Sequence, residues 1–135
     1  MSQENVEAFK RGLEAGNRGD VETLLEVLDP EVEWHTALRA LLAGDATAYR
    51  GHAGVREMLR DMYEAFDEIE IEVSEIRDLG DRLVAIGRTR ARGRESGAET
   101  ESPIAWVVEF KNDKAISLQA YLDPIKALEA AGLSE

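Results

Sequence analysis

"RLVAIGRTRARGRESGAETESPIAWVVEF", residues 82–110, is the stretch that decides the fold. Apolar and polar residues alternate in both of its halves, which is the two-residue period of a half-buried strand. Ser96 and Gly97 provide a turn between the halves. A second turn at "KNDK" (111–114) leads into "AISLQAYL" (115–122), which has strand character as well. The sequence therefore predicts two consecutive antiparallel hairpins.

The same alternation sorts side chains onto two faces. If Trp106 points inward, Ile104, Val108 and Phe110 do so as well, because alternate strand residues share a face. Their expected neighbours on that face are Ala85, Gly87, Thr89, Leu118, Ala120 and Leu122. The small residues among these leave room beside the indole for a hydrophobic or aromatic ligand. The alternative is that Trp106 simply fills the space as a core residue.

The opposite face is predicted to carry charge. Arg88, Arg90 and Arg92 fall on it together with Glu101 and Glu109. Opposite charges on neighbouring strands form cross-strand pairs. The arrangement favours a solvated or subunit-facing surface, with an anion-binding site as the alternative.

Upstream of the hairpins, a helix and a further strand are predicted. The helix runs from Gly51 to about Asp67 and repeats apolar residues every three or four positions, at Val55, Met58, Leu59, Met62 and Phe66. "EIEIEV" (68–73) alternates as a strand, and "DLGD" (78–81) has turn chemistry.

The amino-terminal third is predicted to hold two short helices and a strand. The first helix spans about 4–15 and ends at "GNRG" (16–19), whereas the second is capped by Asp20 and ended by Pro30. "EVEWHT" (31–36) alternates so that Trp34 and Thr36 face inward and His35 outward. Residues 37–49 are predicted as a loop with a helical turn.

A short helix closes the chain. Asp123 is its predicted N-cap, Pro124 its first residue and Gly132 its terminator, with Ile125 and Leu128 as the apolar stripe. The order of elements indicates an α+β fold, in which helices cover one face of an antiparallel sheet.

Composition narrows the choice of partners. The 135 residues suit a single domain, 1–135, and their net charge of −12 disfavours nucleic acid and anionic membrane surfaces. The chain contains no cysteine, and its two histidines lack metal-ligand spacing, so no metal or other cofactor is expected. No leader or membrane-spanning pattern is visible, which predicts a cytoplasmic protein.

Four segments resemble the SnoaL-like branch of the NTF2-like superfamily. They are "GDVETLLEVLDPEVEW" (19–34), "YRGHAGVREML" (49–59), "GRTRARGRESGAE" (87–99) and "FKNDKAISLQAYLDPIKALEAAGL" (110–133). The resemblance implies a cone-shaped barrel, in which a strongly curved, mostly antiparallel sheet wraps round three amino-terminal helices and leaves an apolar pocket open at one end. It implies a polyketide cyclase, a ketosteroid isomerase, an epoxide hydrolase or a non-catalytic module, because one fold serves many functions.

Comparison with the ketosteroid isomerases disfavours that activity. Their tyrosine, base carboxylate and oxyanion-binding acid fall at Gly12, Thr36 and Trp106 of this chain, respectively. Proton abstraction from carbon needs such a base together with donors to the enolate oxygen.

Other polar residues are candidates for catalysis. His52, between Gly51 and Gly54 at the start of the predicted helix, is a candidate general base. Asp123 and Tyr49 are candidate assistants. For each residue a structural role is the alternative: helix start, helix cap and packing, respectively.

The predicted function is binding of a small hydrophobic or aromatic molecule, with cofactor-independent isomerase, cyclase or hydrolase chemistry as a possible extension. The alternative is a non-catalytic binding or dimerisation module, and a homodimer through the outer sheet face is expected. The residues predicted to line the binding site are Trp34, Thr36, Met58, Met62, Tyr63, Phe66, Trp106, Val108, Leu118, Ala120 and Leu122.

Overall fold

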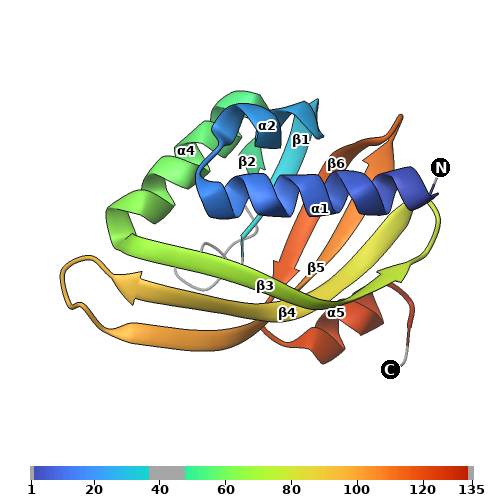
Figure 1. The fold of residues 1–135 in the computed structure, drawn as a ribbon. Helices are drawn as coiled ribbons and strands as arrows, with labels where there is room; N and C mark the ends of the chain where they lie inside the picture. The colour runs from blue at the N-terminus through green and yellow to red at the C-terminus, as the bar shows by residue number, and fades with distance from the viewer. Residues whose placement is uncertain (1, 37–47, 134–135) are drawn as a thin grey trace.

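A curved six-stranded sheet with helices on both faces makes up the described part of the protein (Figure 1). The computed structural model describes residues 2–36 and 48–133. Its helices are α1 (Ser2–Arg18), α2 (Val21–Glu26), α4 (Gly51–Ala65) and α5 (Pro124–Ala130). Its strands are β1 (Leu28–His35), β2 (Tyr49–Arg50), β3 (Phe66–Asp78), β4 (Arg82–Gly93), β5 (Glu99–Lys111) and β6 (Lys114–Tyr121).

The sheet has the order β2-β1-β6-β5-β4-β3 and is not closed into a barrel. The β4–β5 and β5–β6 hairpins are antiparallel, and β1 and β6 are parallel. Asn112 and Asp113 both adopt positive φ in the β5–β6 turn, as tight hairpin turns require. The predicted α+β fold with a strongly curved, mostly antiparallel sheet is confirmed.

A bulge bends the sheet between β3 and β4. Val73 pairs with Gly87 and Glu75 with Ile86, so β3 has one extra residue at Ser74. A Cβ atom on Gly87 would lie 2.0 Å from the backbone oxygen of Glu72, a distance that no side chain tolerates. The absence of a side chain at Gly87 therefore lets the bulged strand approach.

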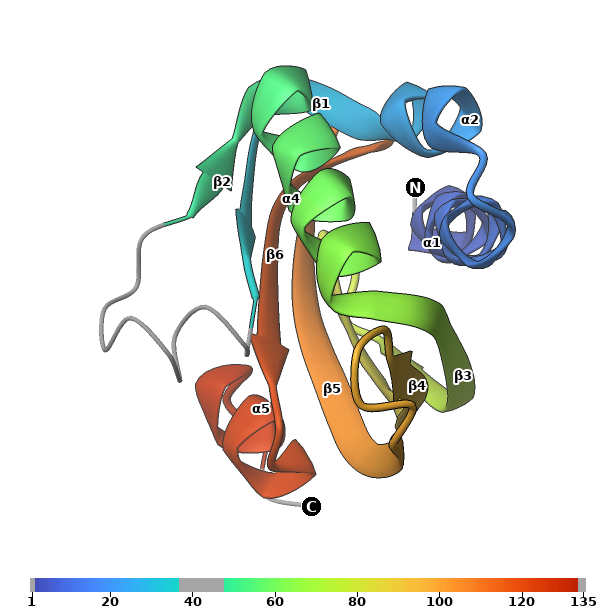
Figure 2. The same ribbon diagram turned by 90° about the vertical axis from the view of Figure 1, so that its left-hand side faces the viewer.

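Helices α1 and α4 lie against the concave face, and α2 links α1 to β1 (Figure 2). Asn17 ties the end of α1 to the edge strand β3: its Nδ2 donates to the Ile71 oxygen at 2.8 Å, and the Ile71 nitrogen donates to its Oδ1 at 3.0 Å. The side-chain amide thus pairs with β3 as a neighbouring strand would, which protects part of this edge.

Helix α5 covers part of the convex face and forms a second apolar core with β4 and β5. Val84 and Ala105 of the sheet pack with Ala127, Leu128 and Ala131. Asp123 accepts a hydrogen bond from the Ile125 nitrogen and Pro124 opens the helix, as predicted. The prediction of the apolar stripe of this helix was partly wrong. Leu128 is buried, but Ile125 is 55% exposed, and Ala127 takes the inward position instead.

Several predicted boundaries were wrong. Helix α1 continues through Gly16 to Arg18, and Gly19, with a φ of 75°, terminates it. Helix α2 ends at Glu26, and Pro30 lies inside β1, where the pairing with β6 is irregular. Helix α4 ends at Ala65, because Phe66 already has extended backbone and begins β3. The prediction for residues 37–47 lies outside the described residues.

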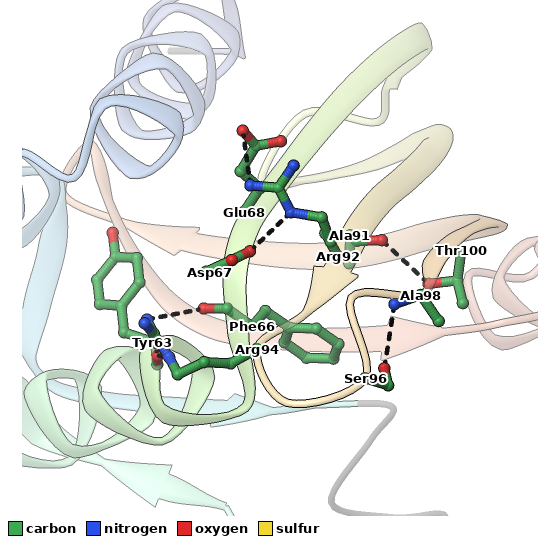
Figure 3. Close-up of polar contacts among 10 residues, drawn as sticks. All are labelled: Tyr63, Phe66, Asp67, Glu68, Ala91, Arg92, Arg94, Ser96, Ala98 and Thr100. Atoms are coloured by element: carbon green, nitrogen blue, oxygen red, sulfur yellow. Dashed lines mark hydrogen bonds and ion pairs between the residues drawn. The ribbon is translucent and has the colours of Figure 1, made fainter.

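The convex face carries the predicted charge ladder. Arg88 pairs with Glu101, Arg90 with Glu70, and Arg92 with both Asp67 and Glu68. Figure 3 shows the last of these at the end of β4, where the hydrogen bond that Arg92 donates to Asp67 raises the pKa of the Arg92 guanidinium. In the described ranges, no helix is long and apolar enough to span a membrane.

Candidate functional site

A cavity of about 260 Å³ lies between α1, α4 and the concave face of the sheet. Among the described residues that line it, none carries a charged side chain, although charged residues make up 33% of the chain. Its few polar side chains are Asn17, Thr36, Tyr63, Thr89, Thr100 and Ser102. Such a wall matches an uncharged apolar guest, since an unpaired charge is costly to desolvate.

Aromatic rings form part of this wall. Trp106 is 5% exposed, and its ring centroid lies 6.3 Å from that of Phe9 at an interplanar angle of 60°. This edge-to-face contact holds the indole against α1. The indole has Ala85 and Ala120 as its cross-strand partners, and cavity volume persists beside it.

The strand and helix periods place the predicted binding residues together. All of them line the cavity: Trp34, Thr36, Met58, Met62, Tyr63, Phe66, Trp106, Val108, Leu118, Ala120 and Leu122. Ala85 and Gly87 share their face but are not lining residues in the described part of the structure. The interpretation of Gly87 as a source of ligand space was wrong, because that position is occupied by the approach of β3.

The three predicted catalytic residues lie elsewhere. His52 Nε2 is 2.9 Å from the backbone oxygen of Leu28, and the Tyr49 hydroxyl donates to Asp61 at 2.9 Å. Asp123 caps α5 by accepting from the Ile125 nitrogen at 3.0 Å. None of the three is a lining residue of the cavity as far as the described ranges define it.

The start of α4 explains the position of His52. Gly51 has a φ of 69°, and a Cβ atom on Gly54 would lie 3.0 Å from the Tyr49 backbone. The two glycines let the chain turn tightly from β2 into α4. The His52 imidazole therefore contacts the backbone of Leu28, and Leu28 in turn is part of the cavity wall.

The second histidine points away from the cavity. The His35 side chain is 20% exposed, and its Nε2 lies 3.7 Å from Glu33. Within the described ranges, no group of three or more histidine and acidic side chains is placed to hold a metal ion.

Two sets of residues stand out among the lining residues that were absent from the predicted site. One is the inner face of α1, with Ala8, Phe9, Gly12, Leu13, Gly16 and Asn17. The apolar stripe of α1 indicates which of its residues face inward, but it does not indicate how far the helix lies from the sheet. The other set consists of three residues with hydroxyl side chains on β4 and β5: Thr89, Thr100 and Ser102. The alternation of strand residues is enough to identify them as inward-facing.

Thr100 and Thr89 differ in their hydrogen bonding. The Thr100 hydroxyl lies 3.5 Å from the Ala91 oxygen, to which it donates (Figure 3). The Thr89 Oγ1 is buried and has no hydrogen-bond partner in the described structure.

Figure 3 also shows how the β4–β5 turn is fixed: Arg94 donates to the Tyr63 and Phe66 oxygens where α4 ends and β3 begins.

Comparison with known proteins gives a family and a fold. The family model of the SnoaL-like domain matches residues 9–118. No curated protein matches the chain. An NTF2-like protein of unknown function from Burkholderia pseudomallei superposes with a TM-score of 0.80 at 22% identity, covering 93% of this chain and 95% of that one.

Two other solved structures are similar over most of their length. TerC, co-crystallised with polyporic acid, has a TM-score of 0.80 at 22% identity, covering 93% of this chain and 96% of TerC. A candidate SnoaL-like polyketide cyclase from Jannaschia sp. CCS1 has a TM-score of 0.75 at 18% identity, covering 96% and 92%. At 18–22% sequence identity, the similarity to these solved structures establishes the fold alone.

Proposed function

The chain belongs to the SnoaL-like domain family, and on that premise we propose that its cavity binds a small hydrophobic or aromatic molecule. The observation that carries the proposal is the cavity wall, which is apolar, uncharged in its described part and built around Trp106 and Phe9. A guest there exchanges water for apolar contacts on the helices and on the sheet. That TerC was crystallised with polyporic acid is consistent with small-molecule binding in this fold.

Naphthalene is a suitable probe, because it is aromatic, uncharged and small. At about 0.6 kcal/mol for each of its heavy atoms, its dissociation constant is expected on the order of 10 to 100 μM. Binding near Trp106 and Trp34 should change tryptophan fluorescence in a saturable way. A response that rises linearly to the solubility limit would contradict the proposal.

Two neighbouring residues of β6 provide matched variants. Ala120 lines the cavity, whereas Gln119 pairs with Val107 on the opposite face. Ala120→Leu should abolish the naphthalene response by filling the cavity, and Gln119→Leu should leave it unchanged. Equal responses from both variants would place any binding outside the cavity.

A second candidate is cofactor-independent acid–base chemistry, favoured by the similarity to the candidate polyketide cyclase from Jannaschia. His52 is the proposed base, with Tyr49 and Asp123 as assistants. To reach a ligand, the imidazole must leave the Leu28 oxygen. All three residues lie outside the described cavity lining and are engaged in hydrogen bonds, which makes binding the better-supported function.

Deuterium exchange tests this chemistry without knowledge of the substrate. In D₂O, a general base accelerates exchange at the carbon beside the carbonyl of α-tetralone, which proton NMR detects. His52→Asn should lower the rate to that of buffer, and Tyr49→Phe or Asp123→Asn should lower it less. A wild-type rate equal to that of buffer would contradict the catalytic candidate.

We also propose a homodimer through the convex sheet face. Ile86 and Tyr121 lie beside the α5 core on this face and are only partly buried. Light scattering should give twice the monomer mass, and Ile86→Glu should give the monomer mass.

A cytoplasmic location, which the cysteine-free composition fits, is proposed as well and is tested by cell fractionation.

A further inference from the structure

Thr89 occupies the middle of a row of inward-facing side chains that crosses three strands. It pairs with Ile71 on β3 and with Ser102 on β5. All three residues line the cavity. The row therefore places two neighbouring hydroxyl side chains, Thr89 and Ser102, in the apolar wall, with Ile71 beside Thr89 on β3.

The hydroxyl of Thr89 is unlike the other polar groups of the wall. Both polar atoms of the Asn17 side chain bond Ile71, Thr100 donates to Ala91, and Thr36 has a partner as well. Tyr63 is 39% exposed and Ser102 is exposed, so water reaches both residues. The Thr89 Oγ1 is covered from water and, in the described structure, has no protein partner.

A buried polar atom without a partner is unfavourable, and most such atoms in folded proteins are satisfied. Two further atoms of this kind, Asn5 Oδ1 and His35 Nδ1, belong to residues outside the cavity lining. Thr89 alone combines an unsatisfied hydroxyl with a place in the wall of the described cavity. Because no protein group of the described structure holds this hydroxyl, a change of the Thr89 side-chain rotamer that turns Oγ1 into the cavity breaks no hydrogen bond.

We propose that Thr89 is the specificity-determining residue of the cavity and donates a hydrogen bond to an uncharged oxygen of the ligand, a carbonyl or a hydroxyl. The inference rests on the proposed binding function and specifies its ligand class: an apolar ring system that bears such an oxygen. A carboxylate is disfavoured at this place, because no charged side chain of the described wall would compensate its desolvation.

The test compares α-tetralone with tetralin, its hydrocarbon counterpart, by NMR chemical-shift titration of backbone amides. Tetralin is the more hydrophobic of the two, so the informative quantity is how the ratio of their dissociation constants changes between proteins. Thr89→Val keeps the shape of the side chain and removes the hydroxyl. It should weaken α-tetralone relative to tetralin by about threefold to tenfold.

Two further variants complete the experiment. Thr89→Ser retains a hydroxyl and should retain the wild-type ratio. Ser117→Ala removes a hydroxyl from the other face of β6, away from the cavity lining, and should also leave the ratio unchanged. The amides of Thr89 and Ser102 should shift with α-tetralone.

The outcomes separate this inference from the proposed function. If both probes bind and Thr89→Val leaves the ratio unchanged, the assignment of Thr89 is wrong while the binding function stands. If tetralin and α-tetralone both fail to bind the wild-type protein, the binding function is wrong and the assignment fails with it.

Discussion

The two faces of the sheet are built from alternate residues of the same strands, yet the convex face packs closely beneath α5 and the concave face encloses a cavity. On the convex face, Ala105 meets Ala127 and Ala131 of α5, and all three are at most 2% exposed. On the concave face, Ala91 and Ala120 face α1 and α4 across the cavity.

The difference lies in the helices. Small residues on both sides let α5 approach the sheet closely. Over the concave face, Phe9 of α1 and Met58 and Met62 of α4 are large, although α1 also has the small residues Ala8, Gly12 and Gly16 on this side. Large side chains hold a helix away from the strands, and small strand residues then leave volume between them. Small residues in a strand therefore indicate ligand space only when the facing helix is held at a distance from that strand.

The largest effect is expected at Gly87, which looks like a cavity residue but serves the bulge. Gly87→Ala should lower the free energy of unfolding by at least about 2 kcal/mol, because its methyl group would collide with the Glu72 oxygen. Urea unfolding measures this change. As a control, Gly16→Ala in α1 meets no atom within 4 Å and should stabilise by about 0.5–1 kcal/mol. A Gly87→Ala protein as stable as wild type would show that β3 moves freely.

The contrast between the faces can be measured directly with one substitution on each. Ala105→Leu should lower the free energy of unfolding by about 1–3 kcal/mol, since it overpacks the core beneath α5. Ala120→Leu should cost less than about 1 kcal/mol, because its added atoms enter the cavity. Equal costs in denaturant unfolding would mean that the concave side is as tightly packed as the convex one.

The charged part of the convex face should contribute less. Arg90 bonds Glu70 and stands opposite Glu101, so Arg90→Gln leaves acidic residues facing one another in a chain of net charge −12. The expected loss is up to about 1 kcal/mol at low salt, and it should shrink as salt is added. Arg60→Gln is the control, because Arg60 is exposed and has no ion pair in the described structure. A loss that does not depend on salt would contradict an electrostatic origin.

The smallest effect is expected at Asp20, the cap of α2 on the concave side. Its hydrogen bonds with Thr23, first from the hydroxyl and then from the backbone nitrogen, hold the pKa of the carboxyl below its ordinary value. The resulting stability is present above the ordinary carboxyl pKa and is lost as pH falls through the lowered one. Asp20→Asn should therefore melt below wild type at neutral pH and match it in acid. A gap that widens in acid would contradict this sign.

Local patterns predicted the hairpins, the caps and the facing of side chains. Trp106 and Thr89 fall on the inner face because a strand alternates, and Asp123 caps α5 because of the residues beside it. Errors arose where tertiary contacts override local signals: Pro30 is accepted within β1, and Phe66 leaves the helical pattern to begin β3. The catalytic assignments stay predictions. His52 and Tyr49 have contacts with Leu28 and Asp61 that no sequence pattern reveals, whereas the Asp123 contact is the predicted helix cap.

The sequence by itself determined which side chains share a face, because backbone periodicity is a property of neighbouring residues. Only the tertiary structure decided that the concave interior is hollow, that Gly87 admits a bulge rather than a ligand, and that the Thr89 hydroxyl has no partner among the described residues. Each of these depends on how closely elements distant in the chain approach one another. That spacing is set by the summed volumes of side chains from several elements at once, which no single segment encodes.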